Sequence, residues 1–322
     1  MQVLVTGSTG YLGRAIVLAL QRSGHAVVAF ARSASTSGLP ATTIDGDIRD
    51  TAAVARAARG CDAIIHAAAL VAVWRKQARE FDDINVGGLA NVLEAARQHG
   101  IPRSVYTSSF LALPPARYSG IPAWNDYQRT KALASLVADR AVAQGAPLIR
   151  LYPGVIYGPG RMTDGNLVGQ MIADHLAGRL PGLVGSDRIW SFAYVDDVAA
   201  AHVVAIERGQ IGGRYVLGGE NAPQMRAFEI VREITGRPLP RRLPGWLASC
   251  AGMVDELRAT WLGGTPHLTT GTLEILLHDW PLDSTRAEQE LGYRVTPLRD
   301  GIANIVSWLA SERLAVHGAS AS

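Results

Sequence analysis

Tyr127 and Lys131 are the two residues of this sequence best suited to acid–base chemistry. They lie four positions apart in the segment YQRTK, so on a helix both side chains would point from the same face. A phenol has an ordinary pKa of about 10. An ammonium at roughly 4 Å contributes about 4 kcal/mol at an effective dielectric of about 20, enough to bring that pKa close to 7. The spacing therefore predicts a tyrosine that exchanges protons near neutral pH, and the alternative is an ordinary surface pair.

Lysine is rare in this chain. Of the 31 Lys and Arg residues, only Lys76 and Lys131 are lysines, so a generic positive charge is supplied by arginine elsewhere. Lysine offers a compact ammonium where arginine offers a planar guanidinium. The use of lysine four residues after Tyr127 favours a specific role for that ammonium.

A glycine-rich turn opens the chain. The apolar run 2–6 predicts a strand, and an apolar-periodic helix is expected over residues 11–22. Between them, Gly7 would permit a tight turn, Gly10 would let the backbone approach a pyrophosphate, and Gly13 would let the helix pack on the strand. Because the motif follows a strand and opens a helix, we expect a dinucleotide site and not merely a flexible turn. The candidate residues are Thr6, Gly7, Thr9, Gly10, Tyr11, Leu12 and Gly13.

Arg32 follows the second predicted strand, residues 26–31. Folds that prefer NAD usually place Asp or Glu here to bond the ribose 2′-hydroxyl, whereas Arg suits a 2′-phosphate. The sequence thus favours NADP(H) as the cofactor, with NAD(H) as the alternative. Arg32 would then stack on the adenine or point to solvent.

Other predicted strands end in residues that suit a bound cofactor. Asp47 could accept a hydrogen bond from the adenine amino group, and the small residues 67–69 would let the backbone pass beside the cofactor. Because parallel strands present their carboxyl ends at one edge, these segments should converge there. The further candidates are Asp47, Ile48, Ala67, Ala68, Ala69, Thr107, Pro153, Gly154 and Val155.

The composition is that of a globular protein. Of the 322 residues, 48% are hydrophobic and 18% charged, and the net charge is +3 without a basic run, which argues against nucleic-acid binding. Cys61 and Cys250 fit neither a disulfide framework nor a metal site. With no uninterrupted apolar stretch of about 18 residues and no signal-like start, we expect a cytoplasmic protein without a transmembrane segment.

Strands and helices alternate over the first 155 residues. This predicts an α/β fold with a doubly wound parallel Rossmann sheet and a smaller, interleaved C-terminal substrate-binding region. We assign residues 1–151 and 189–217 to the NAD(P)-binding domain, residues 152–188 and 218–314 to the substrate-binding region, and residues 315–322 to a frayed tail. The segment 244–262 is an amphipathic helix, expected to be a lid on the substrate pocket, with a membrane-surface helix as the alternative.

Ten segments together resemble the extended short-chain dehydrogenase/reductases, also known as the NAD-dependent epimerase/dehydratase family. Within that family the chain is most similar to the dihydroflavonol-4-reductase-like branch, and to farnesol dehydrogenase-like and hopanoid-associated reductase/epimerase-like proteins. The segments are TGSTGYLG (6–13), DGDIRD (45–50), HAAAL (66–70), INVGGLANVLEAA (84–96), VYTSS (105–109), YQRTK (127–131), PGVIYGPG (153–160), YVDDVA (194–199), RYVLGGEN (214–221) and ELGY (290–293).

The resemblance implies a role for each matching residue. Tyr127 corresponds to the general acid/base, and Lys131 to the residue that lowers its pKa and bonds the nicotinamide ribose. Ser109 corresponds to the serine that bonds the substrate oxygen, with Ser108 as the alternative register. Asn85 corresponds to the helix asparagine near this relay. Residues 153–155 correspond to the loop that fixes the nicotinamide carboxamide. The family also implies a homodimer packed through helices near 78–99 and 124–144.

Two departures from the family pattern narrow the reaction. Pro153-Gly154 stand where sugar-nucleotide epimerases carry a diphosphate-binding Asn, and Phe110-Leu111 stand where dehydratases carry an acidic pair. We therefore expect an NAD(P)-dependent alcohol dehydrogenase or ketoreductase acting on a hydrophobic ketone, aldehyde or alcohol of terpenoid, steroid or flavonoid type. The loop between Ser109 and Tyr127 is shorter than in farnesol dehydrogenases, so farnesol itself is not singled out. The candidate pocket residues are Trp74, Phe110, Met162 and Trp190.

Two other functions remain open at this stage. A sugar-nucleotide epimerase would retain NAD and consume none of it. A protein of the same fold that only senses NAD(P) would bind the cofactor without turnover. The presence of Ser109, Tyr127 and Lys131 together favours the enzyme.

Overall fold

A parallel seven-stranded sheet forms the larger part of the molecule, as predicted. The computed structural model describes residues 1–262, 264–266 and 268–319. The strand order is β10-β6-β5-β4-β1-β2-β3, and every neighbouring pair is parallel. The strands are β1 (Gln2–Thr6), β2 (Ala26–Ala31), β3 (Thr42–Asp45), β4 (Ala63–His66), β5 (Ser104–Thr107), β6 (Leu148–Pro153) and β10 (Arg214–Leu217).

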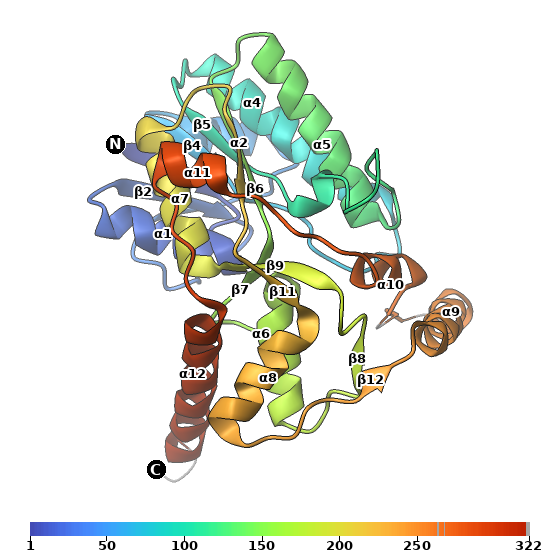
Figure 1. Ribbon diagram of the computed structural model, residues 1–322. Helices are drawn as coiled ribbons and strands as arrows, with labels where there is room; N and C mark the ends of the chain where they lie inside the picture. Colours follow the sequence, from blue (N-terminus) through green and yellow to red (C-terminus); the bar gives the residue numbers. More distant parts are fainter. Residues whose placement is uncertain (263, 267, 320–322) are drawn as a thin grey trace.

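Helices cover both faces of this sheet (Figure 1). One face packs against α1 (Tyr11–Arg22), α7 (Val195–Arg208) and α11 (Thr285–Leu291), and the other against α2 (Thr51–Ala58), α4 (Gly88–Gln98) and α5 (Asp126–Ala143). The central strands are buried on both faces, which explains their unbroken apolar runs. The architecture is therefore the doubly wound Rossmann-like fold expected from the alternation.

A smaller unit lies beyond the carboxyl ends of the large sheet. Its sheet has the order β11-β9-β7, and a short pair joins β8 to β12. An apolar core that includes Trp190, Phe192, Phe228 and Trp280 fills this unit. Its elements are β7 (Val155–Tyr157), α6 (Leu167–Leu176), β8 (Leu183–Val184), β9 (Ile189–Tyr194), β11 (Glu220–Pro223), α8 (Gln224–Thr235), β12 (Arg242–Leu243), α9 (Gly245–Leu262), α10 (Thr270–Leu276) and α12 (Leu298–Ala319).

The expected boundary at residue 189 differs from the structure. Strand β9 pairs with β7 and β11, so it belongs to the small sheet, and the chain returns to the large unit only at α7. Gly154 is the bend between β6 and β7, where an added Cβ would lie 2.6 Å from the backbone oxygen of Ser191. Periodicity could not reveal this because a six-residue apolar strand reads the same in either sheet. The remaining division into two functional regions stays a prediction.

Two helices also depart from their expected form. The helix expected over 78–99 consists of α3 (Arg79–Phe81), a π-helical segment (Asp82–Gly87) and α4. The closing helix α12 continues to Ala319, so residues 315–319 extend it, although we expected them to be frayed. Residues 320–322 lie outside the described residues.

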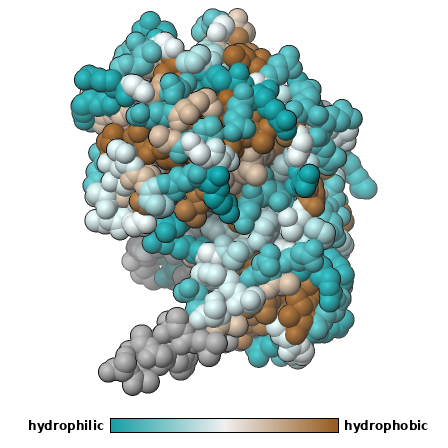
Figure 2. Space-filling model, turned by 90° about the vertical axis from the view of Figure 1, so that its left-hand side faces the viewer, coloured by the Kyte–Doolittle hydropathy of each residue, from teal (hydrophilic) through white to brown (hydrophobic). Residues whose placement is uncertain are grey.

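The surface is polar over much of its area. Figure 2 shows a face on which hydrophobic patches are broken up by hydrophilic side chains. Among the described helices, none is long and apolar enough to cross a membrane.

Trp280 should contribute strongly to stability. It is 1% exposed, and its indole Nε1 donates to the Ile275 oxygen at 3.0 Å. Trp280→Ala should lower the free energy of unfolding by about 3–5 kcal/mol because it empties a closely packed site. Trp261→Ala is the control: Trp261 is 82% exposed, so its loss should change that free energy by no more than about 0.5 kcal/mol. Urea unfolding measures both, and equal effects would contradict this packing.

Candidate active site

Helix α5 holds Tyr127 and Lys131 beside the end of β5. The Asn125 side chain caps the helix by accepting from the backbone N–H of Gln128 at 2.8 Å. The Lys131 ammonium is 3% exposed and donates to the backbone oxygen of Thr107 at 3.0 Å. An ammonium has three donors, so this bond fixes its position and leaves two for other acceptors.

Ser109, and not Ser108, faces the phenol. The Ser109 hydroxyl hydrogen-bonds with Tyr127, and its Oγ also accepts from the Leu111 N–H at 3.2 Å. The Ser108 hydroxyl instead pairs with the Ser135 hydroxyl at 2.8 Å, inside the protein. The structure thus places Ser109 beside the Tyr127 phenol, and Lys131, four residues further along α5, against the end of β5.

The electrostatics of this group differ from the expectation. Burial raises the pKa of Tyr127 to about 12, and the hydrogen bond with Ser109 offsets part of that rise. Burial also lowers the pKa of Lys131 to about 7, because a desolvated ammonium is disfavoured. Our prediction that Lys131 brings the phenol close to neutrality is therefore wrong for this state: the ammonium is bonded to Thr107, and desolvation dominates. The Tyr127 phenol is therefore protonated at neutral pH.

Asn85 acts as a clamp between two backbone segments. Its Oδ1 accepts from the Leu70 N–H at 2.7 Å, and its Nδ2 donates to the Thr130 hydroxyl at 3.0 Å. It lies 2% exposed in the π-helical segment, which turns the side chain toward both partners. Asn85 thereby ties the loop after β4 to the helix of Tyr127, and contacts neither Tyr127 nor Lys131 by a hydrogen bond within the described chain.

The glycine turn has the shape that a pyrophosphate requires. Gly7 has φ +71°, and an added Cβ there would lie 2.6 Å from the Ala68 backbone. An added Cβ at Gly13 would lie 2.1 Å from the Gly7 oxygen, so helix α1 can approach the turn only with glycine there. Gly10 is the N-cap of α1, and no side chain of the described residues caps it. The first amides of α1 are therefore left to an anionic ligand.

Three further candidates of this turn are placed around it. Thr9 is half-buried, and Leu12 packs against the core under the large sheet. The Tyr11 ring lies against Gly158 and Gly160, where added Cβ atoms would meet it. Tyr11 therefore joins the glycine turn to the segment that leads into the small unit.

Arg32 and Asp47, the residues predicted for the adenine end, lie near each other. Arg32 is exposed just after β2, close enough for its charge to help lower the pKa of Asp47. The main cause of that lower pKa is Arg49, whose guanidinium donates to the Asp47 carboxylate at 2.6 Å. Asp47 is thus already engaged, a pairing that the sequence analysis did not anticipate. Ile48 is buried and packs against Gly88.

The other strand ends lie at the same edge. Ala67 donates its N–H to the Thr6 oxygen at 3.2 Å, and the Thr6 hydroxyl bonds His66 Nδ1 at 2.7 Å. The Thr107 hydroxyl bonds His202 Nε2 at 2.9 Å. The half-buried residues Ala67, Ala68 and Ala69 follow β4, and Pro153, Gly154 and Val155 follow from β6 into β7.

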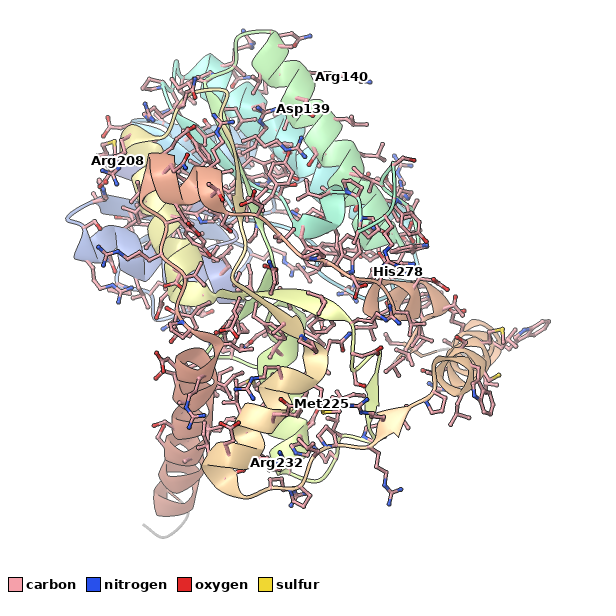
Figure 3. All side chains as sticks on the ribbon, viewed as in Figure 1. Asp139, Arg140, Arg208, Met225, Arg232 and His278 are labelled. Atoms are coloured by element: carbon pink, nitrogen blue, oxygen red, sulfur yellow. The ribbon has the colours of Figure 1, made fainter. Side chains whose placement is uncertain are left out.

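An aromatic wall borders Tyr127, and part of it was missed in the sequence. Phe110 meets Trp280 edge-on with ring centroids 5.1 Å apart, and Trp124 lies 6.2 Å from Trp280. His278, labelled in Figure 3, stacks on Trp124 at 4.3 Å. No sequence signal links Trp280 and His278 to Tyr127, because about 150 residues separate them and only tertiary packing joins them.

The other three pocket candidates are not part of this wall. Trp190 is 3% exposed inside the core of the small unit. The Met162 sulfur accepts from Asn166, and Trp74 is half-buried on the loop after β4. Of the four candidates, Trp190 belongs to the apolar core that Tyr127 packs against, and Phe110 packs against the same core.

The sequence pattern of the NAD dependent epimerase/dehydratase family matches residues 3–218, about two-thirds of the chain. The chain belongs to this family. The resemblance to extended short-chain dehydrogenase/reductases, and to their dihydroflavonol-reductase-like branch, is thereby confirmed. It follows that the protein is an NAD(P)-dependent oxidoreductase by family.

Three relatives illustrate the likeness. Sterol demethylase protein B of Methylococcus capsulatus is 31% identical, with 96% of this chain and 98% of that protein covered. A putative dihydroflavonol 4-reductase of Synechocystis sp. is 30% identical, with 94% and 93% covered. The crystal structure of gox2253 superposes with a TM-score of 0.81 at 29% identity, covering 96% and 98% of the two chains.

Burial of Lys131 predicts a pH-dependent stability. The pKa of Lys131 is about 7 when folded and about 10.4 in an unfolded chain, so the unfolded state binds more protons between these values. The free energy of unfolding should therefore rise with pH through this window. Between about pH 7 and 9 the wild type should gain about 2 kcal/mol relative to Lys131→Met.

The other lysine provides the matched control for this measurement. Lys76 is exposed, so Lys76→Met should follow the wild-type curve. Urea unfolding at several pH values gives all three curves. Parallel curves for the wild type and Lys131→Met would contradict the burial of the ammonium.

Proposed function

We propose that this protein is a reductase that transfers hydride reversibly between NAD(P)H and a hydrophobic ketone, aldehyde or alcohol. The observation that carries the proposal is the joint placement of Ser109, Tyr127 and Lys131 at the end of β5, between the glycine turn and an aromatic wall. A proton donor, a second hydroxyl and a fixed ammonium are the groups that carbonyl reduction requires.

Tyr127 and Ser109 act on the carbonyl oxygen. Both hydroxyls donate hydrogen bonds to it and stabilise the negative charge that develops there. Tyr127 then gives its phenolic proton to this oxygen, which its pKa of about 12 permits throughout the neutral range. In the reverse direction the same phenol must lose its proton, so alcohol oxidation should be favoured by alkaline conditions.

The residues of the chain fit the cofactor. When bound, the nicotinamide supplies the hydride. The pyrophosphate of the cofactor fits the turn at Gly7, the uncapped amides of α1 and the close approach of this helix at Gly13. The two spare N–H donors of Lys131 are available to the hydroxyls of the nicotinamide ribose. The segment 153–155 is available to the nicotinamide carboxamide. Arg32 supports NADP(H), since an exposed guanidinium at the end of β2 suits a 2′-phosphate.

The substrate side favours an apolar molecule. Phe110 and Trp124 are half-buried against the buried Trp280, in the same apolar cluster as Tyr127, where an acidic pair would serve dehydration. Terpenoid, steroid or flavonoid carbonyls match such a wall in size and polarity. The names of two relatives refer to sterols and to dihydroflavonol. We assign substrate binding to the smaller unit, which supplies Trp280.

Sugar-nucleotide epimerisation is the second candidate, because the family takes its name from it. Neither Pro153 nor Gly154, at the end of β6, has the side-chain amide of the asparagine that would hold a diphosphate. A cofactor-sensing protein is the third, and the complete set of Ser109, Tyr127 and Lys131 speaks against it. Net cofactor consumption with a carbonyl substrate separates the reductase from both.

We also propose that two copies associate through α4 and α5. A groove of about 770 Å³ lies between these helices, lined by apolar side chains that include Leu93, Val137 and Leu148. Leu133 and Leu136 of α5 are exposed on their outer side. A second copy would cover these side chains.

Replacing the proton donor should abolish reduction without affecting cofactor binding. Tyr127→Phe should lower kcat by about 10²–10⁴ because the carbonyl oxygen then receives no proton. Turnover is measured with a panel of terpenoid, steroid and flavonoid carbonyls and both cofactors, and cofactor binding is measured by NADPH fluorescence. Ser109→Ala should also reduce kcat strongly, whereas Ser108→Ala should have a much smaller effect because Ser108 bonds Ser135. Full turnover by Tyr127→Phe would refute the role of the phenol.

The cofactor preference has its own test. Arg32→Ala should weaken NADP(H) binding by about 10- to 100-fold, the worth of a charge-assisted contact, and leave NAD(H) binding nearly unchanged. Arg59→Ala is the control, since Arg59 is also exposed but follows α2. Isothermal titration gives the affinity of each of these proteins for each cofactor. Equal binding of NAD(H) and NADP(H), unaltered by Arg32→Ala, would remove the preference.

A further inference from the structure

Helix α9 carries an unusual concentration of exposed apolar side chains. Of the fifteen large hydrophobic residues exposed in the described chain, six lie on this one helix, so the concentration is not the ordinary scatter of single residues. Trp261 is 82% exposed and Trp246 is 70% exposed. The six are Trp246, Leu247, Met253, Val254, Leu257 and Trp261.

These side chains form one continuous stripe. At about 100° per residue, all six and the exposed Cys250 fall within an arc of about 120°. The opposite side carries the small buried residues Ala248, Gly252 and Ala259. An added Cβ at Gly252 would lie 3.2 Å from Leu273 of α10, so this side faces the protein. In Figure 1, α9 lies at the outer edge of the molecule beside α10.

The acidic residues of α9 are turned away from the stripe. Asp255 accepts from Arg258 at 2.9 Å, and Glu256 accepts from the Thr270 N–H at 2.8 Å. Both carboxylates therefore bond within the protein, Asp255 to its own helix and Glu256 to the start of α10. No carboxylate of α9 lies on the apolar arc.

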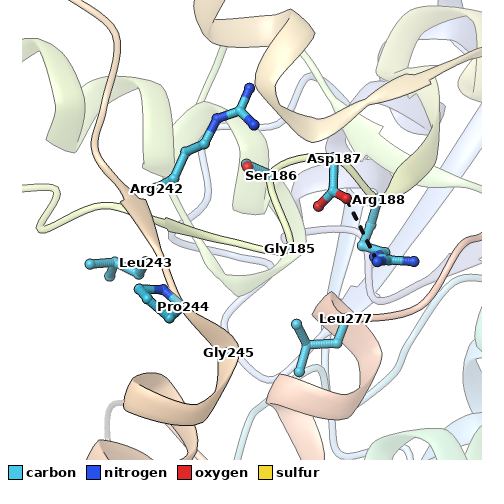
Figure 4. Close-up of a pocket in the computed structure, with 9 residues that line it drawn as sticks. All are labelled: Gly185, Ser186, Asp187, Arg188, Arg242, Leu243, Pro244, Gly245 and Leu277. Atoms are coloured by element: carbon cyan, nitrogen blue, oxygen red, sulfur yellow. Dashed lines mark ion pairs between the residues drawn. The ribbon is translucent and has the colours of Figure 1, made fainter.

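Exposed arginines, by contrast, lie at the start of the helix. Arg241 and Arg242 lie in the segment that leads into it, and neither guanidinium forms an ion pair with a carboxylate of the described residues. Arg242 borders a cavity of about 420 Å³ at the foot of α9, shown in Figure 4. The one carboxylate that lines this cavity, Asp187, pairs with Arg188 at 3.6 Å. Positive charge beside an apolar stripe with tryptophan near both ends suits an anionic lipid surface.

The stripe is also connected to the active site. Helix α10, on which α9 packs, begins beside Trp124: an added Cβ at Gly271 would lie 2.0 Å from the Trp124 oxygen. Trp124 belongs to the aromatic wall and precedes Tyr127 by three residues. A surface that holds α9 would therefore lie next to the apolar side of the substrate site.

We propose that the exposed face of α9 docks the protein on the surface of an anionic lipid bilayer. The stripe enters the interface between headgroups and acyl chains, with Trp246 and Trp261 near its two ends. Arg241 and Arg242 contact the lipid phosphates. The helix lies in the plane of the membrane and does not cross it, in agreement with the absence of a spanning helix among the described residues.

Vesicle binding by the full chain tests this proposal. The probes are phosphatidylcholine vesicles with and without phosphatidylglycerol, in flotation assays at low and high salt. We expect binding that requires the anionic lipid and weakens with salt. Trp246→Ser/Trp261→Ser should lower the partition coefficient at least about tenfold, and Arg241→Gln/Arg242→Gln about tenfold. Brominated lipids should quench tryptophan emission of the wild type and lose most of that effect in the tryptophan variant.

The control variant removes two apolar side chains exposed elsewhere. Leu18 and Ile211 are 37% and 48% exposed on the large unit, and Leu18→Ser/Ile211→Ser should bind vesicles as the wild type does. Light scattering after gel filtration, and activity on a water-soluble ketone, complete the comparison. Absence of vesicle binding, or binding equal in all variants, overturns the proposal. Two further results would overturn it if the wild type does not bind vesicles. If Trp246→Ser/Trp261→Ser converts a dimer to a monomer, α9 is a subunit contact. If the same variant loses activity on the soluble ketone, α9 is a lid.

Discussion

The hydrogen bond from the Lys131 ammonium to the Thr107 oxygen joins the two elements on which the active site depends. It holds helix α5 against the end of β5 and so sets Tyr127 beside Ser109. The bond is buried, and desolvation lowers the pKa of the ammonium to about 7. A buried charge with one protein partner is costly unless further acceptors approach it. The two N–H donors that the Thr107 oxygen leaves available are the groups that we propose bind the cofactor ribose.

Close backbone contacts position everything around this pair. Gly7 meets Ala68, Gly13 meets Gly7, and Gly154 meets the Ser191 backbone, each at a distance that excludes a side chain. Asn85 adds a fourth tie between the loop after β4 and helix α5. These contacts bring the glycine turn, the proton donor and the small unit to one edge of the sheet, as parallel strands with short loops require.

Local patterns were sufficient to predict the large sheet and the glycine turn, because each depends on residues close in sequence. Three features could not be predicted in this way. The membership of β9 in the small sheet depends on pairing with β11, the aromatic wall depends on Trp280, and the clamp at Asn85 depends on a π-helical turn. The predicted direction of the Tyr127 pKa shift was wrong, because the prediction considered the nearby charge and not desolvation of the phenol.

We propose that hydride passes between the cofactor and an apolar carbonyl while Tyr127 donates a proton to the carbonyl oxygen. The most direct measurement uses NADPH deuterated at its transferable hydrogen, with terpenoid, steroid and flavonoid ketones, and mass spectrometry of the products. We expect an alcohol that carries one deuterium on the former carbonyl carbon, with one cofactor oxidised for each alcohol formed. No deuterium in any product, together with epimerisation of a nucleotide sugar at unchanged cofactor concentration, would contradict it.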